Sequence, residues 1–234
     1  MRWSLKWVAS AIFVVTSGVS AATSPANPVD GAAPATTDSA ALDEMVRDAK
    51  GRLQYWPSVP ELVVLTSVMQ YHTTDSREYV ATSEMLSAKE MESLVADLKM
   101  ALRELTDGTF NEFTTIRFEA VPPGATATIV RPKQIVVGRF KGLTDLAHTI
   151  GFGGRTTRRS GEIVGAAILL DSDFDRTSAK RRLSRTHELG HALGFNHVRS
   201  RVSIMNERIG PAVTDVDRQI GLLAFQRPGI RTAE

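Results

Sequence analysis

The most chemically informative stretch of the chain is residues 187–197, whose letters HELGHALGFNH have the form H-E-x-x-H-x-x-G-x-x-H. Three of the five histidines of the chain lie in it. Chance would place those fixed positions in the chain with a probability on the order of 10⁻⁵, so the pattern is far more specific than a bare H-E-x-x-H. Imidazole nitrogens bind metals, and a carboxylate can move protons. The stretch therefore predicts a metal centre with a general base beside it.

The spacing of these residues has a simple geometric consequence. His187 and His191 are four residues apart, so on a helix they share one face and can reach one metal at about 2.0–2.1 Å. His197 can join them only if the helix ends, because six more helical residues would carry it roughly 9 Å along the axis. Gly194 is placed to end the helix, since glycine adopts the left-handed conformation without a Cβ penalty. Glu188 is placed to take a proton from a metal-bound water.

The stretch resembles the zinc-binding consensus of the metzincin metalloproteases, which follow the third histidine with a turn that carries a methionine beneath the metal. Ser203-Ile204-Met205-Asn206 follows at short range, so Met205 is the candidate methionine. The short gap resembles the matrixin branch. The chain departs from the vertebrate matrixins at Val198, where they usually carry serine, and at Asn206, where an aromatic residue or proline often sits. No tyrosine follows Tyr79, so the extra tyrosine ligand of some metzincins is not available.

The resemblance implies a zinc-dependent endopeptidase that hydrolyses the peptide bonds of a polypeptide substrate. His187, His191 and His197 would bind one catalytic Zn²⁺, and Glu188 would be the catalytic base. Gly194 and Met205 would support the site. Two alternatives stay open: a zinc metallohydrolase acting on cell-wall peptides, and a non-catalytic, zinc-stabilised binding module. The glutamate argues against the second, because a purely structural zinc is usually closed by four protein ligands.

The composition limits the class of protein. The chain has 234 residues, of which 42% are hydrophobic and 23% charged, as expected for a globular domain with its own core. A net charge of +2 does not favour nucleic acid as a partner, although the sequence pI is near 9.0. The absence of cysteine excludes disulfides, thiolate ligands and the cysteine switch that keeps many matrixins latent. The oligomeric state and the cleavage preference are left open.

The N-terminal region predicts export. Residues 1–21 have a positive start at Arg2 and Lys6, an apolar centre and small residues before a cleavage point, as in a secretory signal. The apolar run is too short to span about 30 Å of hydrocarbon, so we expect no stable membrane insertion after cleavage. The predicted location is extracellular or periplasmic. An exported chain without disulfides favours a bacterial source.

The remaining boundaries follow from composition. Residues 22–41 are rich in alanine, threonine, serine and proline, which predicts a flexible linker or a pro-segment. Residues 42–59 are predicted to be an N-terminal extension, either a short amphipathic helix packed on the body or part of a propeptide. Residues 60–234 would form the catalytic domain.

Periodicity within residues 60–234 predicts an α+β fold. The resemblance implies a metzincin-type order, with a twisted mixed sheet whose edge strand lines the cleft, then the zinc helix, the methionine turn and a C-terminal helix. We expect strands at 62–69, 115–121, 134–140, 145–150 and 163–171, and helices at about 87–106, at about 178–193 and after Thr214. Residues 151–154 and the arginine, threonine and serine residues that follow them are predicted to form a loop between the last two strands. On the second strand, alternation places Ile116, Phe118 and Ala120 on one face. Residues 146–150 resemble the matrixin edge strand, which would pair with an extended peptide.

Three further groups of residues are candidates for binding. Asp171, Asp173 and Asp175 resemble a calcium-binding stretch of the matrixins, and the alternative is a polar turn that caps the zinc helix. His148 matches a histidine that binds a structural zinc in vertebrate matrixins, and the alternative is an ordinary strand histidine. Arginines cluster before the motif and on the preceding loop: Arg155, Arg158, Arg159, Arg181, Arg182 and Arg185. They form either a solvated surface or a site that favours acidic substrates.

Overall fold

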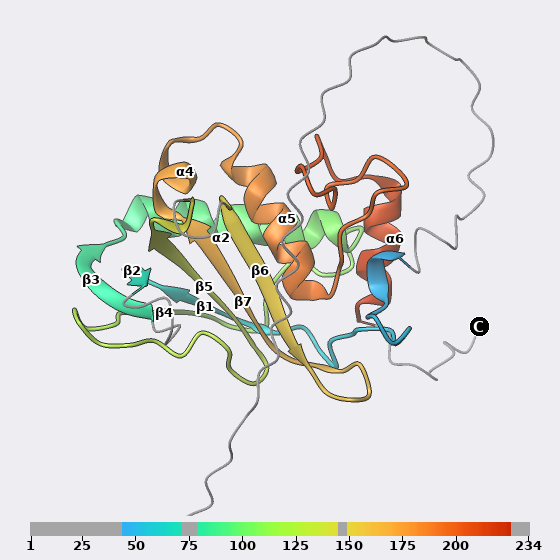
Figure 1. Cartoon of the computed structure of the whole chain (residues 1–234), viewed down its shortest axis with the longest axis horizontal. Coiled ribbons are helices and arrows are strands. Elements are labelled where there is room, and N and C mark those ends of the chain that lie inside the picture. The colour runs from blue at the N-terminus through green and yellow to red at the C-terminus, as the bar shows by residue number, and fades with distance from the viewer. Residues whose placement is uncertain (1–43, 72–78, 145–148, 226–234) are drawn as a thin grey trace, which may run out of the picture. The chain divides into compact units, whose positions relative to one another are not determined.

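The computed structural model describes residues 44–71, 79–144 and 149–225, and all structural statements below concern these residues. They form an α+β fold in which helices lie against a mixed sheet (Figure 1). The strands are β1 (Glu61–Leu65), β2 (Ser67–Tyr71), β3 (Tyr79–Met85), β4 (Ile116–Glu119), β5 (Gln134–Lys141), β6 (Gly151–Thr157) and β7 (Ile163–Asp171). The helices are α2 (Ala88–Leu105), α4 (Ser172–Thr177), α5 (Arg181–Leu193) and α6 (Asp215–Leu223).

Strand β5 lies at the centre of the sheet. It pairs in parallel with β1 and β2 on one side and with β7 on the other, and β4 pairs in parallel with β1. The two antiparallel strands are β3, beside β2, and β6, beside β7. Strand β6 is therefore an edge strand within the described residues, and it lies next to α5 (Figure 1).

The predicted strand at 62–69 is in fact two strands, β1 and β2. The chain changes its hydrogen-bond partners between them. The Thr66 N–H donates to the carbonyl of Glu119, at the end of β4, at 2.9 Å, whereas the Thr66 carbonyl accepts from the N–H of Leu86, just after β3, at 2.7 Å. One continuous apolar run therefore serves two different neighbours.

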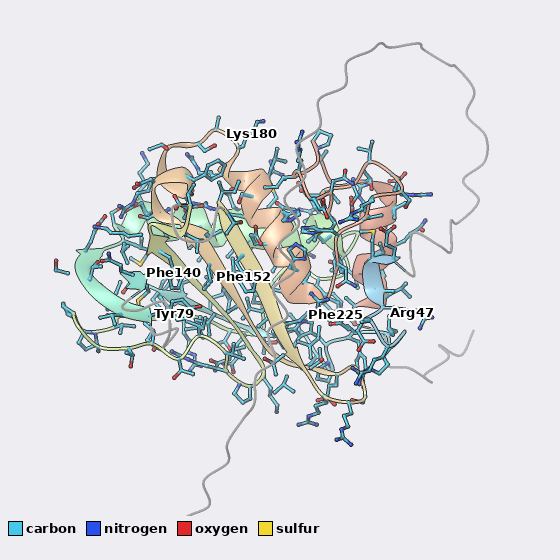
Figure 2. The ribbon with its side chains drawn as sticks, viewed as in Figure 1. Arg47, Tyr79, Phe140, Phe152, Lys180 and Phe225 are labelled. Atoms are coloured by element: carbon cyan, nitrogen blue, oxygen red, sulfur yellow. The ribbon has the colours of Figure 1, made fainter. Side chains whose placement is uncertain are left out.

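Each face of the sheet has its own apolar core. Leu62 and Val64 point into the larger core, which α2 and α5 cover, whereas Val63 and Leu65 point to the opposite face. That second face is covered by the loop that follows β4, through residues such as Ile129. On the same face, Tyr79 and Phe140 pack edge to face with ring centroids 5.1 Å apart (Figure 2).

Helix α2 forms as its sequence predicts. The Ser87 hydroxyl accepts from the Glu90 N–H at its start, and the Glu90 carboxylate accepts from the Ser87 N–H in return, which is a capping box. Its apolar stripe is fully buried at Leu94, Leu98, Leu102 and Leu105. Burying each leucine contributes about 1.5–3 kcal/mol, so the stripe anchors α2 beneath α5.

The main correction concerns the edge of the sheet. Residues 145–148 of the predicted strand at 145–150 lie outside the described residues, and Thr149 and Ile150 are not in a strand. The predicted loop at 151–154 is wrong, because these residues begin strand β6. Glycine lowers strand propensity, but here a side chain would collide with α5. A Cβ added to Gly153 would lie 2.3 Å from the Glu188 carbonyl oxygen.

Other expectations need smaller corrections. Strand β3 and helix α4 were not predicted, and α5 begins at Arg181 rather than near 178. Ile116 and Phe118 share one face of β4, as predicted, because they pair with Leu62 and Val64, but Phe118 is 53% exposed and Ala120 lies beyond the end of the strand. The physical reason is that β4 is an edge strand of the sheet, where packing covers it incompletely.

Residues 44–57 form part of the larger core. Residues 44–46 are helical, as the predicted short amphipathic helix requires, whereas residues 47–57 are not. Met45, Val46 and Trp56 are buried with the residues of α2 and α5. The Trp56 indole N–H also donates to the carbonyl of Ala192 at 3.1 Å. This segment is thus attached to the end of α5.

The predicted signal at 1–21 and linker or pro-segment at 22–41 lie outside the described residues. Within the described part of the chain, no helix combines the length and the apolar character needed to cross a membrane.

Candidate metal centre

The three histidines of the motif converge on one point. Their Nε2 atoms form a nearly equilateral triangle, with distances of 3.1 Å between His187 and His191, 3.1 Å between His191 and His197, and 3.2 Å between His187 and His197. Three nitrogens at tetrahedral positions about 2.05 Å from one zinc ion would be about 3.3 Å apart. The triangle therefore fits a single metal ion, and it is the only such group of histidines and carboxylates among the described residues.

Helix α5 ends where the third ligand requires it to end. Gly194 has φ of 119° in the left-handed region, and its N–H donates to the His191 carbonyl at 3.1 Å. The Phe195 N–H then donates back to the Gly190 carbonyl at 2.9 Å. The chain leaves the helix axis here and brings His197 beside the first two histidines, as the spacing predicted.

Backbone carbonyls orient two of the imidazoles. The Nδ1 of His187 lies 2.7 Å from the Ile204 carbonyl, and the Nδ1 of His191 lies 2.8 Å from the Phe195 carbonyl. A carbonyl oxygen only accepts, so each Nδ1 is the donor and carries the proton. The lone pair of each Nε2 then points to the centre of the triangle, as a metal ligand requires.

Burial keeps the histidines neutral. It lowers the pKa of His187 to about 4. The hydrogen bond to the Ile204 carbonyl raises the pKa, but by a smaller amount. Burial also lowers the pKa of His191 well below its usual value and, to a lesser extent, that of His197. Neutral imidazole is the form that binds metal, so the site does not have to lose protons at pH 7 before it is filled.

Met205 lies beneath the histidine helix. It is fully buried, and a Cβ added to Gly190 would lie only 2.4 Å from its sulfur. Its turn is closed by hydrogen bonds between Ser203 and Asn206, because the Ser203 N–H donates to the Asn206 side chain at 3.0 Å. The Asn206 side-chain amide donates in turn to the Val198 carbonyl at 2.8 Å. The sequence predicted the place of Met205 but not the use of Asn206.

Asp217 holds this turn from α6. Its carboxylate accepts from the Ser203 hydroxyl, from the Ile204 N–H at 3.2 Å and from the N–H and hydroxyl of Thr214 at 2.7 and 2.8 Å. Ile204 is also the residue whose carbonyl orients His187. The cap of α6 is therefore connected to a metal ligand through one residue. Sequence analysis found the capping threonine but not this connection, because nothing local links residue 217 to residue 204.

Glu188 lies at the foot of the cleft and is 5% exposed. Burial raises its pKa to about 8, opposed by a hydrogen bond from the Gly153 N–H of β6. A Cβ added to Gly151 would lie 2.6 Å from its Oε1. Glycine in the edge strand is therefore what leaves room for this carboxylate. A dication bound at the triangle would favour the ionised form.

A cleft of about 1070 Å³ opens over the histidines. One wall is the start of β6, including Phe152, which is 53% exposed (Figure 2). The floor is α5, from Leu183 to His191, and the other wall is the segment 207–211. An edge strand thus borders the cleft beside the predicted metal, although it is β6 rather than residues 146–150.

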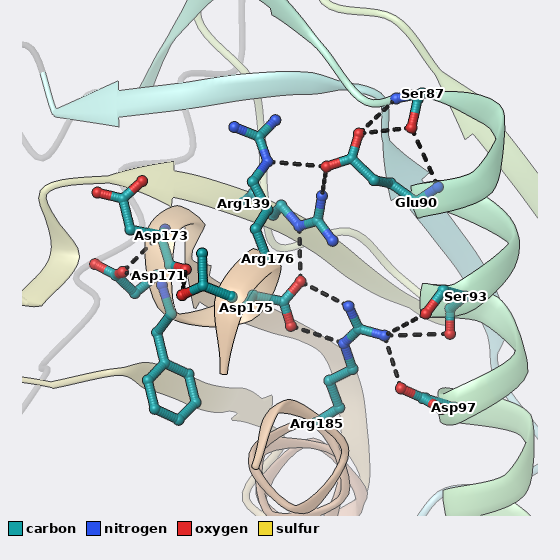
Figure 3. Close-up of polar contacts among 12 residues, drawn as sticks. Ser87, Glu90, Ser93, Asp97, Arg139, Asp171, Asp173, Asp175, Arg176 and Arg185 are labelled. Atoms are coloured by element: carbon teal, nitrogen blue, oxygen red, sulfur yellow. Dashed lines mark hydrogen bonds and ion pairs between the residues drawn. The ribbon is translucent and has the colours of Figure 1, made fainter. Parts of the chain in front are cut away.

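The predicted calcium site is not present at the three aspartates. Both oxygens of Asp175 accept from the Arg185 guanidinium at 2.7 Å, and one also accepts from Arg139 (Figure 3). Asp171 instead caps α4 and accepts from the Thr144 N–H, and the side chain of Asp173 is exposed. The carboxylates of Asp171 and Asp175 are therefore committed to internal partners, and the three aspartates do not converge on one cation.

The predicted arginine surface is also wrong in part. Arg185 is 1% exposed and joins α5 to α4 and α2, where it pairs with Asp97 at 2.7 Å (Figure 3). Arg155 is half-buried and donates to the carbonyl of His191 at the end of α5. Arg158 and Arg182 do lie at the surface, paired with Glu162 and Glu104. Arg159 also lies at the surface, whereas Arg181 is half-buried. His148 lies outside the described residues.

Comparison with known proteins adds little to this geometry. No protein-family model and no curated protein matches the chain. Among solved structures, the chain is similar to metalloproteinase-II from Bacteroides fragilis, with a TM-score of 0.41 and 15% sequence identity. The match covers 74% of this chain, and the chain spans 55% of that protein. We therefore base the function on the residues of this chain.

Proposed function

We propose that the protein is a zinc-dependent endopeptidase of metzincin type, similar to the matrixins and exported by its N-terminal signal. The observation that supports this most is the Nε2 triangle, with sides of 3.1 to 3.2 Å, next to the buried carboxylate of Glu188. An ion held by three side chains keeps a coordination position free for chemistry, unlike a structural zinc with four protein ligands.

The chain's own residues suit peptide hydrolysis. Bound Zn²⁺ would supply Lewis acidity, which lowers the pKa of water and polarises a carbonyl. Glu188 would accept a proton from the attacking water and pass it to the leaving amine. His187, His191 and His197 would hold the ion.

A polypeptide substrate suits the wall of the cleft. Strand β6 is antiparallel to β7 and borders the cleft at Gly151 and Phe152. An extended peptide can add to such an edge through backbone hydrogen bonds, whatever its sequence. This would lay the peptide beside Glu188.

The test is the substitution Glu188→Gln. It removes the proton acceptor and leaves the three imidazoles in place, so we expect hydrolysis of casein to fall about 10²- to 10⁴-fold. Zinc content, measured by mass spectrometry, should stay at one ion per chain. Glu92→Gln makes the same change at an exposed position of α2 and is the matched control.

Native proteolysis by the Glu188→Gln variant would contradict the mechanism. Hydrolysis of cell-wall peptides but not of casein would instead assign the protein to the wall-directed metallohydrolases. A zinc-loaded chain that binds no hydroxamate and cleaves neither substrate would be a binding module.

A further inference from the structure

Arg155 is a half-buried cation behind the metal centre. From β6, its guanidinium donates to the side chain of Gln54 at 2.5 Å, to the carbonyls of His191 and Phe195 at 2.9 and 3.1 Å, and to the side chain of Asn196 at 2.6 Å. All four acceptors are neutral oxygens. Burial lowers the pKa of Arg155 to about 10, which leaves it charged at pH 7. The protein therefore keeps a partly desolvated charge at this position, and removing a charge from water is costly.

The place of this charge is the C-terminal end of α5. The last carbonyls of a helix lack partners within the helix and carry the negative end of its dipole. Arg155 supplies both a positive charge and donors to them, in particular to His191. It thus fixes the end of the helix from which His191 projects.

Phe195 connects this cation to the second ligand. Its carbonyl accepts from Arg155 Nη1 at 3.1 Å and also from His191 Nδ1 at 2.8 Å. The imidazole and the guanidinium therefore share one oxygen. A shift of that carbonyl would change the orientation of the His191 ring, and hence the direction of its Nε2 lone pair.

Asn196 connects the same cation to the third ligand. It immediately precedes His197, and its side-chain oxygen accepts from Arg155. Its side-chain amide donates to the Arg47 carbonyl at 2.7 Å, and its N–H donates to the Met45 carbonyl at 2.7 Å. The residue next to His197 is therefore held between β6 and the N-terminal segment.

Glu44 holds the chain on the other side of His197. Its carboxylate accepts from the Arg199 N–H at 3.1 Å and from the Ser200 hydroxyl at 3.2 Å. His197 itself is exposed, so packing of its own ring does little to fix it. Its position depends on these neighbours.

We propose that Arg155 is a positioning residue of the metal centre: it fixes His191 and His197 relative to His187, so that the three Nε2 atoms are already in place for one metal ion. The inference rests on the metal site of the proposed function, and not on peptide hydrolysis. Outer partners that orient metal ligands typically change affinity by 10- to 100-fold when they are removed. Arg155 acts on two ligands at once, so we expect the upper part of that range.

The test measures zinc affinity by competition with a chromogenic chelator. Arg155→Met removes the donors and the charge, and we expect its zinc dissociation constant to rise about 100-fold. Arg155→Lys keeps the charge but cannot reach four acceptors at once, so a smaller rise is expected. Arg158→Met is the matched control, because that arginine is exposed and directly follows the same strand, and the zinc affinity of this variant should equal that of the wild type.

Cobalt substitution separates positioning from simple destabilisation. The visible absorption of bound Co²⁺ reports the ligand geometry in folded molecules, so a shifted or weakened band is expected for Arg155→Met. A variant that is folded by circular dichroism, with native zinc affinity and a native cobalt spectrum, would overturn the proposal.

If Arg155→Met does not fold, Asn196→Ser tests the same connection without leaving a neutral residue against four acceptors. We expect it to weaken zinc binding about 10-fold, and native affinity in that variant would also overturn the proposal. The proposed function fails separately: a wild-type chain that binds zinc but cleaves no peptide would refute the peptidase and leave the role of Arg155 intact.

Discussion

At the scale of the single residue, the histidines are prepared for a metal by contacts that lie outside the motif. His187 depends on the Ile204 carbonyl and His191 on the Phe195 carbonyl. These oxygens fix both the tautomer and the ring orientation. A ligand held in this way loses little freedom when the ion binds, which is how outer contacts raise metal affinity.

Asp217 gives a prediction at this scale. Four groups donate hydrogen bonds to the carboxylate of Asp217. In Asp217→Asn, one acceptor oxygen is replaced by an NH₂ group, which itself donates and therefore cannot accept from these groups. We expect the free energy of unfolding to fall by about 2–3 kcal/mol, since hydrogen bonds to a buried charge are lost. Urea titration of the zinc-loaded protein measures the change.

The matched control for this prediction is Asp215→Asn, in the first turn of the same helix. The side chain of Asp215 is 92% exposed, so its change should cost much less. Equal stability of the Asp217→Asn variant and the wild type would show that the carboxylate does not hold the Met205 turn.

The convergence of the three candidate ligands beside Glu188 could be predicted from the sequence because these residues lie within eleven consecutive positions, 187–197. Helical geometry alone relates His187, Glu188 and His191. The contacts that orient them could not be predicted in this way. Arg155 meets its acceptors from 36 or more residues away, and Asp217 reaches Ile204 across 13 residues. Arg155 has no local pattern that distinguishes it from a surface residue, and the capping pattern of Asp217 with Thr214 does not indicate the contact with Ile204.

At the scale of the element, the contact between β6 and α5 determines how the cleft is built. Glycine at positions 151 and 153 lets the strand approach the helix closely enough for the Gly153 N–H to reach Glu188. The edge strand, the base and the ligand helix are thus one packed unit. A change in the spacing between them would move the base relative to the ligands.

Gly153→Ala tests this contact. Its new methyl group would lie 2.3 Å from the Glu188 carbonyl oxygen and 2.6 Å from the His191 Cβ, neither of which can move freely. The strand must therefore separate from the helix. We expect a loss of about 1–3 kcal/mol in the free energy of unfolding, and at least a 10-fold loss of the proposed peptidase activity.

Gly154→Ala is the matched control at the neighbouring position. Its methyl group meets only the Phe152 ring, which is 53% exposed and can rotate away. Its activity should stay within about 3-fold of the wild type. If both variants kept native activity and stability, close packing of β6 on α5 would not matter for function.

Elements with strong local signals were predicted well. Helix α2 has a capping box and an apolar stripe, and β7 is a continuous apolar strand whose predicted range, 163–171, agrees with the structure. Strand β6 was mistaken for a loop because its glycines reflect tertiary packing, which overrides local propensity. The prediction of a calcium site at Asp171, Asp173 and Asp175 was wrong for a related reason. The arginines that neutralise Asp175 come from other elements, so their presence could not be predicted from the local sequence.

At the scale of the whole molecule, buried ion pairs join the elements behind the cleft. Arg139, Asp175 and Arg185 are each 2% exposed or less, and they connect β5, α4 and α5 (Figure 3). Arg139 and Arg176 extend the network to Glu90 on α2. Breaking one partner of such a network leaves a buried charge without compensation, so its members depend on one another.

The network predicts a dependence of stability on pH. Burial raises the pKa of Glu90, but hydrogen bonds from Ser87 and the charges of Arg139 and Arg176 outweigh it and lower the pKa from 4.5 to about 2. A lowered folded-state pKa stabilises the fold above pH 4.5, and this contribution is lost as the pH falls towards 2. Glu90→Gln removes the charge and keeps a side chain that suits the capping box.

We expect Glu90→Gln to be about 1–3 kcal/mol less stable than the wild type at pH 7, and this difference to shrink at pH 3. Urea unfolding of both proteins at the two pH values measures it. Glu92→Gln, at an exposed position of the same helix, should match the wild type throughout. A difference that is the same at both pH values would mean that the charge of Glu90 does not stabilise the fold.

The packing of residues 44–57 has a consequence for the order of events during synthesis. Glu44 contacts Arg199 across 155 residues, and Trp56 donates to Ala192 across 136. Residues 44–57 are translated long before the residues that they contact, and contacts of such large sequence separation form slowly. A ribosome would have to release residues 187–200 before all three ligands could be held together. The nascent chain would therefore lack a complete candidate metal centre until these residues had been translated.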